Sequence, residues 1–117
     1  MDIALETKKN ILIVKISGEM DISTVPDFKE KVKIRTENNR IKHLVLDLSK
    51  VKFIDSSGLG AILGRYRFLD KKGGKVLLVN PGQQIKKIFD MSGILKIMDV
   101  YSSIDEALSE LEEGRIA

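Results

Sequence analysis

The residues best equipped for chemistry are Asp55, Ser56, Ser57 and Gly58, which stand where a predicted strand becomes a predicted helix. Two hydroxyls between a carboxylate and a glycine can supply a nucleophile, a cradle for a phosphate, or a site that receives a phosphate. The same four residues can also form a turn and a helix cap. The rest of the sequence is needed to distinguish these four possibilities.

A serine hydrolase is disfavoured because no base is predicted beside the serines. A serine hydroxyl becomes a nucleophile when a neighbouring base, usually histidine, takes its proton. The chain has one histidine, His43, and it begins a predicted strand at the end opposite to Ser56. We interpret it as a strand-edge or surface histidine. The elbow motif Gly-x-Ser-x-Gly is also absent, since Ile54 stands where its first glycine would be needed before Ser56.

Nucleotide binding is disfavoured by the spacing of the glycines. Gly58 and Gly60 begin a Gly-x-Gly-x-x-Gly pattern, but Leu63 occupies its last position and the next glycine is Gly64. No Gly-Lys-Ser/Thr triplet occurs, so the chain has no P-loop. We predict instead that these glycines let a helix pack closely on a sheet, and we predict no cofactor.

Acid–base or metal chemistry would have to use Asp21, Asp47 or Asp55. Two neighbouring carboxylates can transfer protons or hold a hard cation. We predict that Asp21 and Asp55 lie at one edge of a sheet, whereas Asp47 lies within a strand. No further set of ligands accompanies them. We therefore predict no metal site, and interpret the acids as solvated or as acceptors of backbone N–H bonds.

The two serines leave two interpretations open. Either Ser56 or Ser57 can cap the helix by accepting a hydrogen bond from a free N–H. A serine at a helix N-terminus is also well placed to carry a phosphate, because the N–H groups and the helix dipole favour an anion. Phosphorylation would add about −1.5 to −2 charges beside Asp55 and near Asp21. A partner packed on that edge would have to bury the added charge next to these acids, so binding would be lost without a change of fold.

Composition limits the class of protein. The 117 residues fit one domain, which we predict to span residues 1–117. The chain has no cysteine, which excludes disulfides and thiolate metal sites. No apolar run approaches the ~18 residues that a membrane span needs, and no signal peptide opens the chain. We therefore expect a soluble, cytoplasmic protein with no membrane partner.

Charge is unevenly distributed along the chain. Residues 1–102 carry 19 Lys+Arg and 12 Asp+Glu, a balance of +7, whereas residues 103–117 carry five acids and one arginine, a balance of −4. A basic face can bind nucleic acid or an acidic protein. Because the chain has only six aromatic residues and no basic–aromatic pattern, we predict no nucleic-acid partner.

Hydrophobic periodicity predicts the elements that position these residues. Short runs of β-branched and other apolar residues predict strands at residues 3–7, 11–17, 43–48, 75–79 and, more weakly, 95–100. Helical spacing of apolar residues predicts helices at 25–38, from the serines to about Lys72, from about Ile85 to Gly93, and after Ser103. Two sequences, Thr24-Val25-Pro26-Asp27 and Ser103-x-x-Glu106, have the form of helix starts.

This order predicts an α/β domain with a mixed, mostly parallel β-sheet of four to five strands and four helices. After an initial hairpin, strands alternate with helices, as they do in βαβ units. Partners of such sheets meet the loops beyond the carboxyl ends of the strands. Residues 18–24 and 52–58 each follow a strand, so we expect them at one edge.

Three segments resemble one family when they are taken together. With "GEMD" before it and "FDMSGILKI" after it, "DSSGLGAILGRY" is similar in order and spacing to the anti-sigma factor antagonists of the STAS family. The wording "LGRY" and "FDMSG" is closest to the sporulation branch, the antagonists of anti-sigma-F, rather than to the general-stress branch. The likeness runs over nearly the whole chain, although the acidic last helix is less alike.

The resemblance implies a partner switch rather than an enzyme. Members of the family bind an anti-sigma factor that is also a serine kinase, and so release the sigma factor. The kinase phosphorylates the antagonist, and a separate serine phosphatase restores it. The first hydroxyl after the aspartate of the motif, here Ser56, receives the phosphate. Our predicted contact surface around it comprises Asp21, Thr24, Asp55, Ser57, Gly58, Leu59 and Gly60.

The resemblance also gives the basic main segment a role, as an electrostatic guide towards an acidic partner face. Two other functions remain as alternatives. One is a free-standing STAS-like domain that binds a small ligand, such as a nucleotide or lipid, in the same edge groove. The weaker one is a serine-dependent enzyme.

Overall fold

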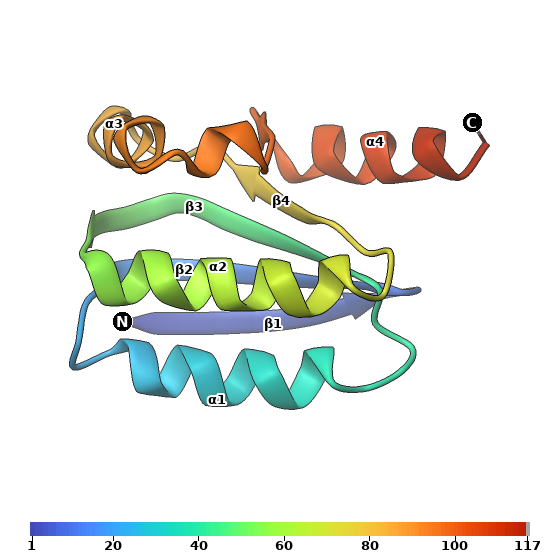
Figure 1. Cartoon of the computed structure of the whole chain (residues 1–117), viewed down its shortest axis with the longest axis horizontal. Coiled ribbons are helices and arrows are strands. Elements are labelled where there is room, and N and C mark those ends of the chain that lie inside the picture. Colours follow the sequence, from blue (N-terminus) through green and yellow to red (C-terminus); the bar gives the residue numbers. More distant parts are fainter. Residues whose placement is uncertain (117) are drawn as a thin grey trace.

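The computed structural model describes the backbone of residues 1–116 and the side chains of residues 1–112. Its elements follow one another in the predicted order β-β-α-β-α-β-α-β-α, with one added turn of 3-10 helix (Figure 1). Their bounds are β1 (Asp2–Lys8), β2 (Ile11–Met20), α1 (Val25–Thr36), β3 (His43–Ile54), α2 (Ser56–Asp70), β4 (Val76–Val79), α3 (Gln83–Ser92), η1 (Ile94–Lys96), β5 (Val100–Tyr101) and α4 (Ile104–Ile116).

The five strands form one sheet in the order β1-β2-β3-β4-β5. Strand β1 pairs antiparallel with β2, and every later pair is parallel. The sheet is therefore mixed and mostly parallel, and four helices accompany it, which confirms the predicted fold class. Because β2, β3 and β4 run in the same direction, the loops that follow them lie at one edge, and the loops that precede them lie at the other.

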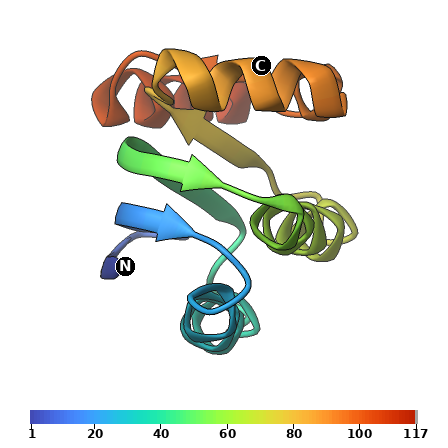
Figure 2. The same ribbon diagram turned by 90° about the vertical axis from the view of Figure 1, so that its left-hand side faces the viewer.

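Helices cover the two faces of the sheet unequally. Alternate residues of β2 and β3 face a large core that receives Phe28 of α1, Ile62 of α2 and Phe89 of α3. The intervening strand residues face a smaller cluster, which Ala107 and Leu111 of α4 complete. Figure 2 shows α1 and α2 together on one side of the sheet. The described side chains therefore form two apolar clusters, with the sheet between them.

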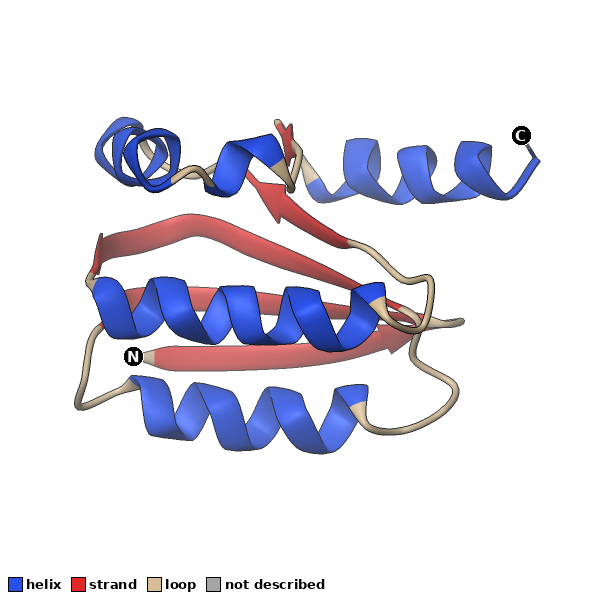
Figure 3. Ribbon diagram, in the orientation of Figure 1, coloured by secondary structure: helices blue, strands red, loops and turns tan. Residues whose placement is uncertain are grey.

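The expected strand over residues 95–100 is mostly wrong. Residues Ile94–Lys96 form a turn of 3-10 helix, and β5 is confined to Val100–Tyr101, as Figure 3 shows by colour. Gly93 ends α3 with a left-handed φ of 84°, which redirects the chain. Ile94 and Met98 are then buried together, and the Met98 N–H donates to the Ile94 carbonyl over 3.0 Å. The apolar residues thus follow helical spacing over this stretch, and not the alternation of a strand.

Strands β2 and β3 are longer than their apolar runs predict. Gly18 does not end β2, which continues to Met20 through two shifts of register against β3. The left-handed φ of 98° at Gly18 suits a glycine within such an irregular strand. Strand β3 continues to Ile54 because Val51 and Ile54 still bury their side chains in the large core. Both strands consequently reach the edge at which Ser56 lies.

Gly74, after α2, lies so close to the backbone of Lys42 that a side chain would not fit there, and this gives a prediction. A Cβ on Gly74 would collide with the Lys42 carbonyl group, whereas a Cβ on Gly64, within α2, would meet nothing within 4 Å. We expect Gly74→Ala to lower the free energy of unfolding by at least about 3 kcal/mol, because backbone has to move. Gly64→Ala, the matched control, should leave it unchanged or raise it by up to about 1 kcal/mol. Urea unfolding of both variants measures the difference, and equal effects would contradict the model of the Gly74 contact.

Candidate functional site

The candidate site lies where β2 and β3 end side by side. Met20 pairs with Ile54 in the last step of the parallel ladder, and the Asp55 N–H donates to the Met20 carbonyl over 3.1 Å. Two short segments continue from there: residues 21–24 lead into α1, and residues 55–58 lead into α2. We call these two segments the Ser56 edge. It lies at the left of Figure 1.

The carboxylate of Asp55 joins the two segments. Its Oδ1 accepts hydrogen bonds from the Ser57 N–H (2.9 Å), the Gly58 N–H (3.2 Å) and the Ser57 hydroxyl. Its Oδ2 accepts the N–H of Ile22, in the other segment, over 3.1 Å. Asp55 is thus the N-cap of α2, and the prediction that Ser56 or Ser57 accepts the capping bond is wrong. A carboxylate on extended backbone can reach both N–H groups of the first turn and keeps its second oxygen for Ile22.

Asp21 organises the neighbouring turn in a similar way. Its Oδ1 accepts hydrogen bonds from the Ser23 hydroxyl (2.7 Å), the Ser23 N–H (3.0 Å) and the Thr24 N–H (3.1 Å). The Thr24 hydroxyl donates to the Glu19 carbonyl over 2.8 Å and accepts the Asp21 N–H over 2.9 Å. Thr24 therefore holds the loop and makes no capping bond to α1, so the helix start predicted from Thr24 and Asp27 is formed without its capping box.

Both carboxylates are held in the ionised form. A hydrogen bond from the Ser23 side chain is the main cause that lowers the pKa of Asp21, and one from the Ser57 side chain does the same for the pKa of Asp55. Backbone N–H groups add to both effects, and desolvation opposes them. The prediction that Asp21 and Asp55 share an edge is confirmed. As predicted, they accept backbone N–H bonds, and so does Asp47, which accepts the N–H of Ser49 within β3.

The two serines differ in what their hydroxyls do. Ser57 is half-buried and its hydroxyl donates to Asp55. Ser56 is exposed at the first position of α2, and its hydroxyl makes no hydrogen bond with any of the described residues. Ser56 is therefore the hydroxyl at this edge that is both accessible and uncommitted.

The glycines of this segment have different roles. Gly58 is buried, and a Cβ there would lie 2.6 Å from Cγ1 of Ile54 and 3.0 Å from the Met20 carbonyl oxygen. The predicted close packing of α2 on the sheet is thus confirmed at Gly58. It is wrong at Gly60 and Gly64, where a Cβ would meet nothing within 4 Å. Leu59, between Gly58 and Gly60, packs partly against the large core.

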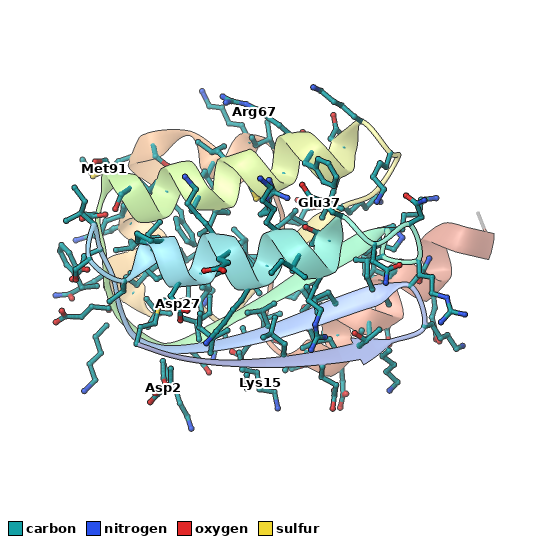
Figure 4. The ribbon with its side chains drawn as sticks, turned by 90° about the horizontal axis from the view of Figure 1, so that it is seen from below. Asp2, Lys15, Asp27, Glu37, Arg67 and Met91 are labelled. Carbon is teal, nitrogen blue, oxygen red and sulfur yellow. The ribbon has the colours of Figure 1, made fainter. Side chains whose placement is uncertain are left out.

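Exposed apolar side chains near the Ser56 edge were missed in the sequence. Ile22, 79% exposed, is on the 21–24 segment, and Phe53, 47% exposed, lies just before Asp55. Met91, 87% exposed, lies near the end of α3, and Figure 4 shows it at the same end of the molecule as the start of α2. The sequence carries little signal for them, because an apolar residue in a strand or helix is normally predicted to be buried.

His43 is not the surface residue that we predicted. Its side chain is 7% exposed, and its Nδ1 accepts the Lys75 N–H over 3.1 Å. The ring thus links the start of β3 to Lys75, the residue that directly precedes β4. It lies at the opposite end of β3 from Ser56, as predicted, so it cannot serve Ser56 as a base.

The described residues contain no group of three or more His, Cys, Asp or Glu side chains that could hold a metal ion. A cavity of about 260 Å³ lies between the β1–β2 turn and α4, and it is lined by residues such as Lys9, His43 and Glu112. It therefore lies away from the Ser56 edge. Within the described residues, no helix combines the length and apolar character that crossing a membrane requires.

Comparison with known proteins identifies the family. The model of the STAS domain matches residues 2–107. The anti-sigma F factor antagonist of Paenibacillus polymyxa is 38% identical over 112 residues, which cover 96% of each protein. The structure of the anti-sigma factor antagonist SpoIIAA in its unphosphorylated form superposes with a TM-score of 0.86 at 26% identity, over 96% of this chain and 97% of that one.

A second solved structure, of the Bacillus cell fate determinant SpoIIAA in the phosphorylated form, superposes with a TM-score of 0.77 at 26% identity. The match covers 94% of this chain and 99% of that chain. The fold and the family agree with the resemblance that the motifs around Ser56 indicate. The chain therefore belongs to the STAS domain family, and among its members it is similar to the anti-sigma factor antagonists.

Proposed function

We propose that this protein is an anti-sigma factor antagonist that works as a partner switch. Its unphosphorylated form binds an anti-sigma factor that is a serine kinase, and the sigma factor is thereby released. Phosphorylation of Ser56 ends the binding, and a serine phosphatase restores it. The observation that carries the proposal is the uncommitted Ser56 hydroxyl, exposed at the start of α2 beside two ionised carboxylates.

Ser56 suits a kinase better than Ser57 does. A kinase needs a hydroxyl that can enter its active site and lose its proton to a base. The Ser57 hydroxyl donates to Asp55 and helps to hold the cap of α2, so its transfer to a kinase would cost these bonds. No such bond has to be broken at Ser56 within the described residues. The two hydroxyls thus divide the work, with Ser56 as acceptor and Ser57 as support.

A phosphate on Ser56 would act mainly through its charge. It would add about −1.5 to −2 charges at an edge where Asp21 and Asp55 are already ionised. The Ser57 and Gly58 N–H groups already donate to Asp55, but the dipole of α2 still favours an anion at its N-terminus, so the domain itself tolerates the phosphate. A docked partner would have to desolvate this charge next to the carboxylates, which is unfavourable unless the partner supplies cations.

A protein partner fits this edge better than a small ligand does. The proposed contact surface comprises Asp21, Thr24, Asp55, Ser57, Gly58, Leu59 and Gly60, and the exposed Ile22, Phe53 and Met91 extend it with apolar area. Exposed large apolar side chains at one site are typical of protein interfaces. The cavity between the β1–β2 turn and α4 is at the other edge, and its volume of about 260 Å³ is small for a nucleotide or lipid. A serine-dependent enzyme would need a base, and His43 is distant and accepts the Lys75 N–H.

The similarity to an anti-sigma F factor antagonist supports the sporulation branch over the general-stress branch, and a cytoplasmic setting follows from the proposed partners. An operon that contains an anti-sigma kinase and a sigma factor beside this gene would support the assignment. A kinase partner encoded elsewhere can be found by capture on the unphosphorylated protein.

Ser56→Ala tests the acceptor. With the cognate anti-sigma kinase and Mg-ATP, we expect the unaltered protein to gain one phosphate by mass spectrometry and Ser56→Ala to gain none. Ser57→Ala is the matched control, since it removes the neighbouring hydroxyl but keeps the acceptor, and it should still be phosphorylated. Phosphorylation of Ser56→Ala to the same extent as the unaltered protein would refute the site.

Ile22→Ala tests the apolar part of the contact surface. A buried interface anchor contributes about 1–2 kcal/mol, so we expect roughly a tenfold loss of affinity for the kinase. Ile34, 65% exposed on α1 outside the Ser56 edge, gives the matched control Ile34→Ala, which should change affinity less than about twofold. Isothermal titration calorimetry measures both. Equal affinities of the two variants would exclude Ile22 from the interface.

The lowered pKa values of Asp55 and Asp21 predict acid sensitivity. A depressed pKa in the folded state stabilises the fold above the ordinary value of 3.8, and this stabilisation is lost as the pH falls through the folded-state pKa. In Asp55→Asn, the amide nitrogen cannot accept a hydrogen bond from Ile22 as the carboxylate does. We expect this variant to be less stable at about pH 7, with the difference shrinking at about pH 3. Urea unfolding at both pH values measures it, and a difference independent of pH would contradict the role of the charge.

A further inference from the structure

The excess of basic residues is concentrated at the edge of the sheet opposite to Ser56. The three connections there, residues 8–10, 37–42 and 71–75, carry seven lysines and arginines and a single acid. By contrast, the connections that follow β2, β3 and β4, residues 21–24, 55 and 80–82, carry two acids and no basic residue. Nearly all of the +7 balance of residues 1–102 therefore lies at one end of the molecule, at the right of Figure 1.

This charge is too distant to guide a partner onto the Ser56 edge by local attraction. The twelve residues of β3 separate the two edges by roughly 35 Å. The Debye length is about 8 Å at physiological ionic strength, so the field of the basic loops is largely screened at Ser56. The expected role of the basic segment as a guide to the switch partner therefore does not fit its position, and the basic loops need another explanation.

The basic loops are packed against one another by backbone contacts. The N–H groups of Lys42 and His43 both donate to the Asn10 carbonyl, over 2.8 and 3.1 Å, and the Leu44 N–H donates to the Lys75 carbonyl over 2.9 Å. Lys72 belongs to this scaffold, because its Nζ donates to the carbonyls of Thr36 (3.3 Å) and Ile41 (3.1 Å). The loops thus present their charges from fixed positions.

Six of the seven basic side chains remain, and we call them the basic edge. They are exposed, and none has a carboxylate within 4 Å among the described residues. The ion pair found in that part of the chain, Lys31–Asp27, is on α1. Like charges gathered at one edge repel one another, which destabilises the fold. A bound anion would reduce this repulsion. The six residues are Lys8, Lys9, Arg40, Lys42, Lys71 and Lys75.

The chemistry of the basic edge favours carboxylates as its ligands. Five of the six residues are lysines, whose ammonium groups act as point charges and pair with carboxylates without a required geometry. None of the large exposed apolar side chains of the described residues lies in these loops, so there is no platform for stacking bases and no anchor for a lipid surface.

The chain already places carboxylates beside this edge. The cavity of about 260 Å³ has Lys8 and Lys9 on one wall, from the β1–β2 turn, and Asp105 and Glu112 on the other, from α4. An acidic helical segment thus runs next to Lys8 and Lys9. Lys42 and Lys71 do not line this cavity, and Lys75 lines a separate one with Asp70 and Asp99. A second acidic segment would complete the neutralisation that α4 begins.

We propose that the basic edge is a second docking surface, which takes an acidic segment of a protein partner. Because it lies at the opposite end of the strands from Ser56, it can be occupied while the Ser56 edge is occupied. Phosphorylation would then release one partner and leave the other in place. The domain would act as a connector between two proteins, only one of which is controlled by the switch.

The test measures binding to a short fluorescent poly-L-glutamate peptide by anisotropy. In Lys42→Gln/Lys71→Gln/Lys75→Gln we expect affinity to fall about tenfold, since each exposed charge pair contributes modestly and the three act together. The control, Lys29→Gln/Lys86→Gln/Lys87→Gln, removes the same charge from exposed positions outside the basic edge and should change affinity less than about twofold. Thermal unfolding verifies that both variants are folded.

Binding should also weaken steeply as salt is added, because the contacts are electrostatic. Equal losses in the two triple variants, or no binding of poly-L-glutamate by the unaltered protein, would overturn the proposal. A single-stranded oligonucleotide and phosphatidylglycerol vesicles are tested at ~0.15 M salt, and tighter binding of either one would overturn the assignment to a protein partner. No kinase is present, so failure here is separate from failure of the partner switch.

Discussion

The hydrogen bonds to the Asp55 carboxylate are the interaction on which the candidate site depends. One oxygen caps α2 through Ser57 and Gly58, and the other holds Ile22 in the loop before α1. A single side chain therefore sets the position of the helix that presents Ser56 and of the loop that flanks it. The close approach of Gly58 to Ile54 and Met20 brings the start of α2 near enough for this arrangement. The exposed Ser56 hydroxyl thus has neighbours whose side chains are already held by hydrogen bonds.

Much of the fold and the proximity of Asp21 to Asp55 could be predicted from the sequence. The buried runs at residues 43–48 and 75–79 and the helical spacing after Ser57 identify the α/β order, because burial on both faces or on one stripe leaves a periodic signal. Asp55 and Ser56 could be singled out because they stand where a predicted strand meets a predicted helix, although a helix cap alone would explain their residue types. The motifs then pointed to the family that the comparison identifies.

The remaining features depend on contacts that no local pattern encodes. Nothing near Asp55 in the sequence indicates the Ile22 N–H, which is far away along the chain and meets it only when β2 and β3 pair. The apolar residues after Gly93 predict a strand, and only the structure shows that Ile94 and Met98 are buried in the same cluster, at helical spacing. Gly60 has the same residue type as Gly58 but no close neighbour. The exposure of Phe53 likewise depends on where the sheet ends.

The separation of the two apolar clusters has a consequence for how this chain can change in evolution. Helix α4 packs through Ala107 and Leu111 on the face of the sheet that is turned away from α1 and α2. Substitutions on α4 are therefore insulated from the start of α2 by the whole thickness of the sheet. Exposed positions of the C-terminal helix can therefore change without altering the geometry around Ser56, as long as Ala107 and Leu111 keep their packing.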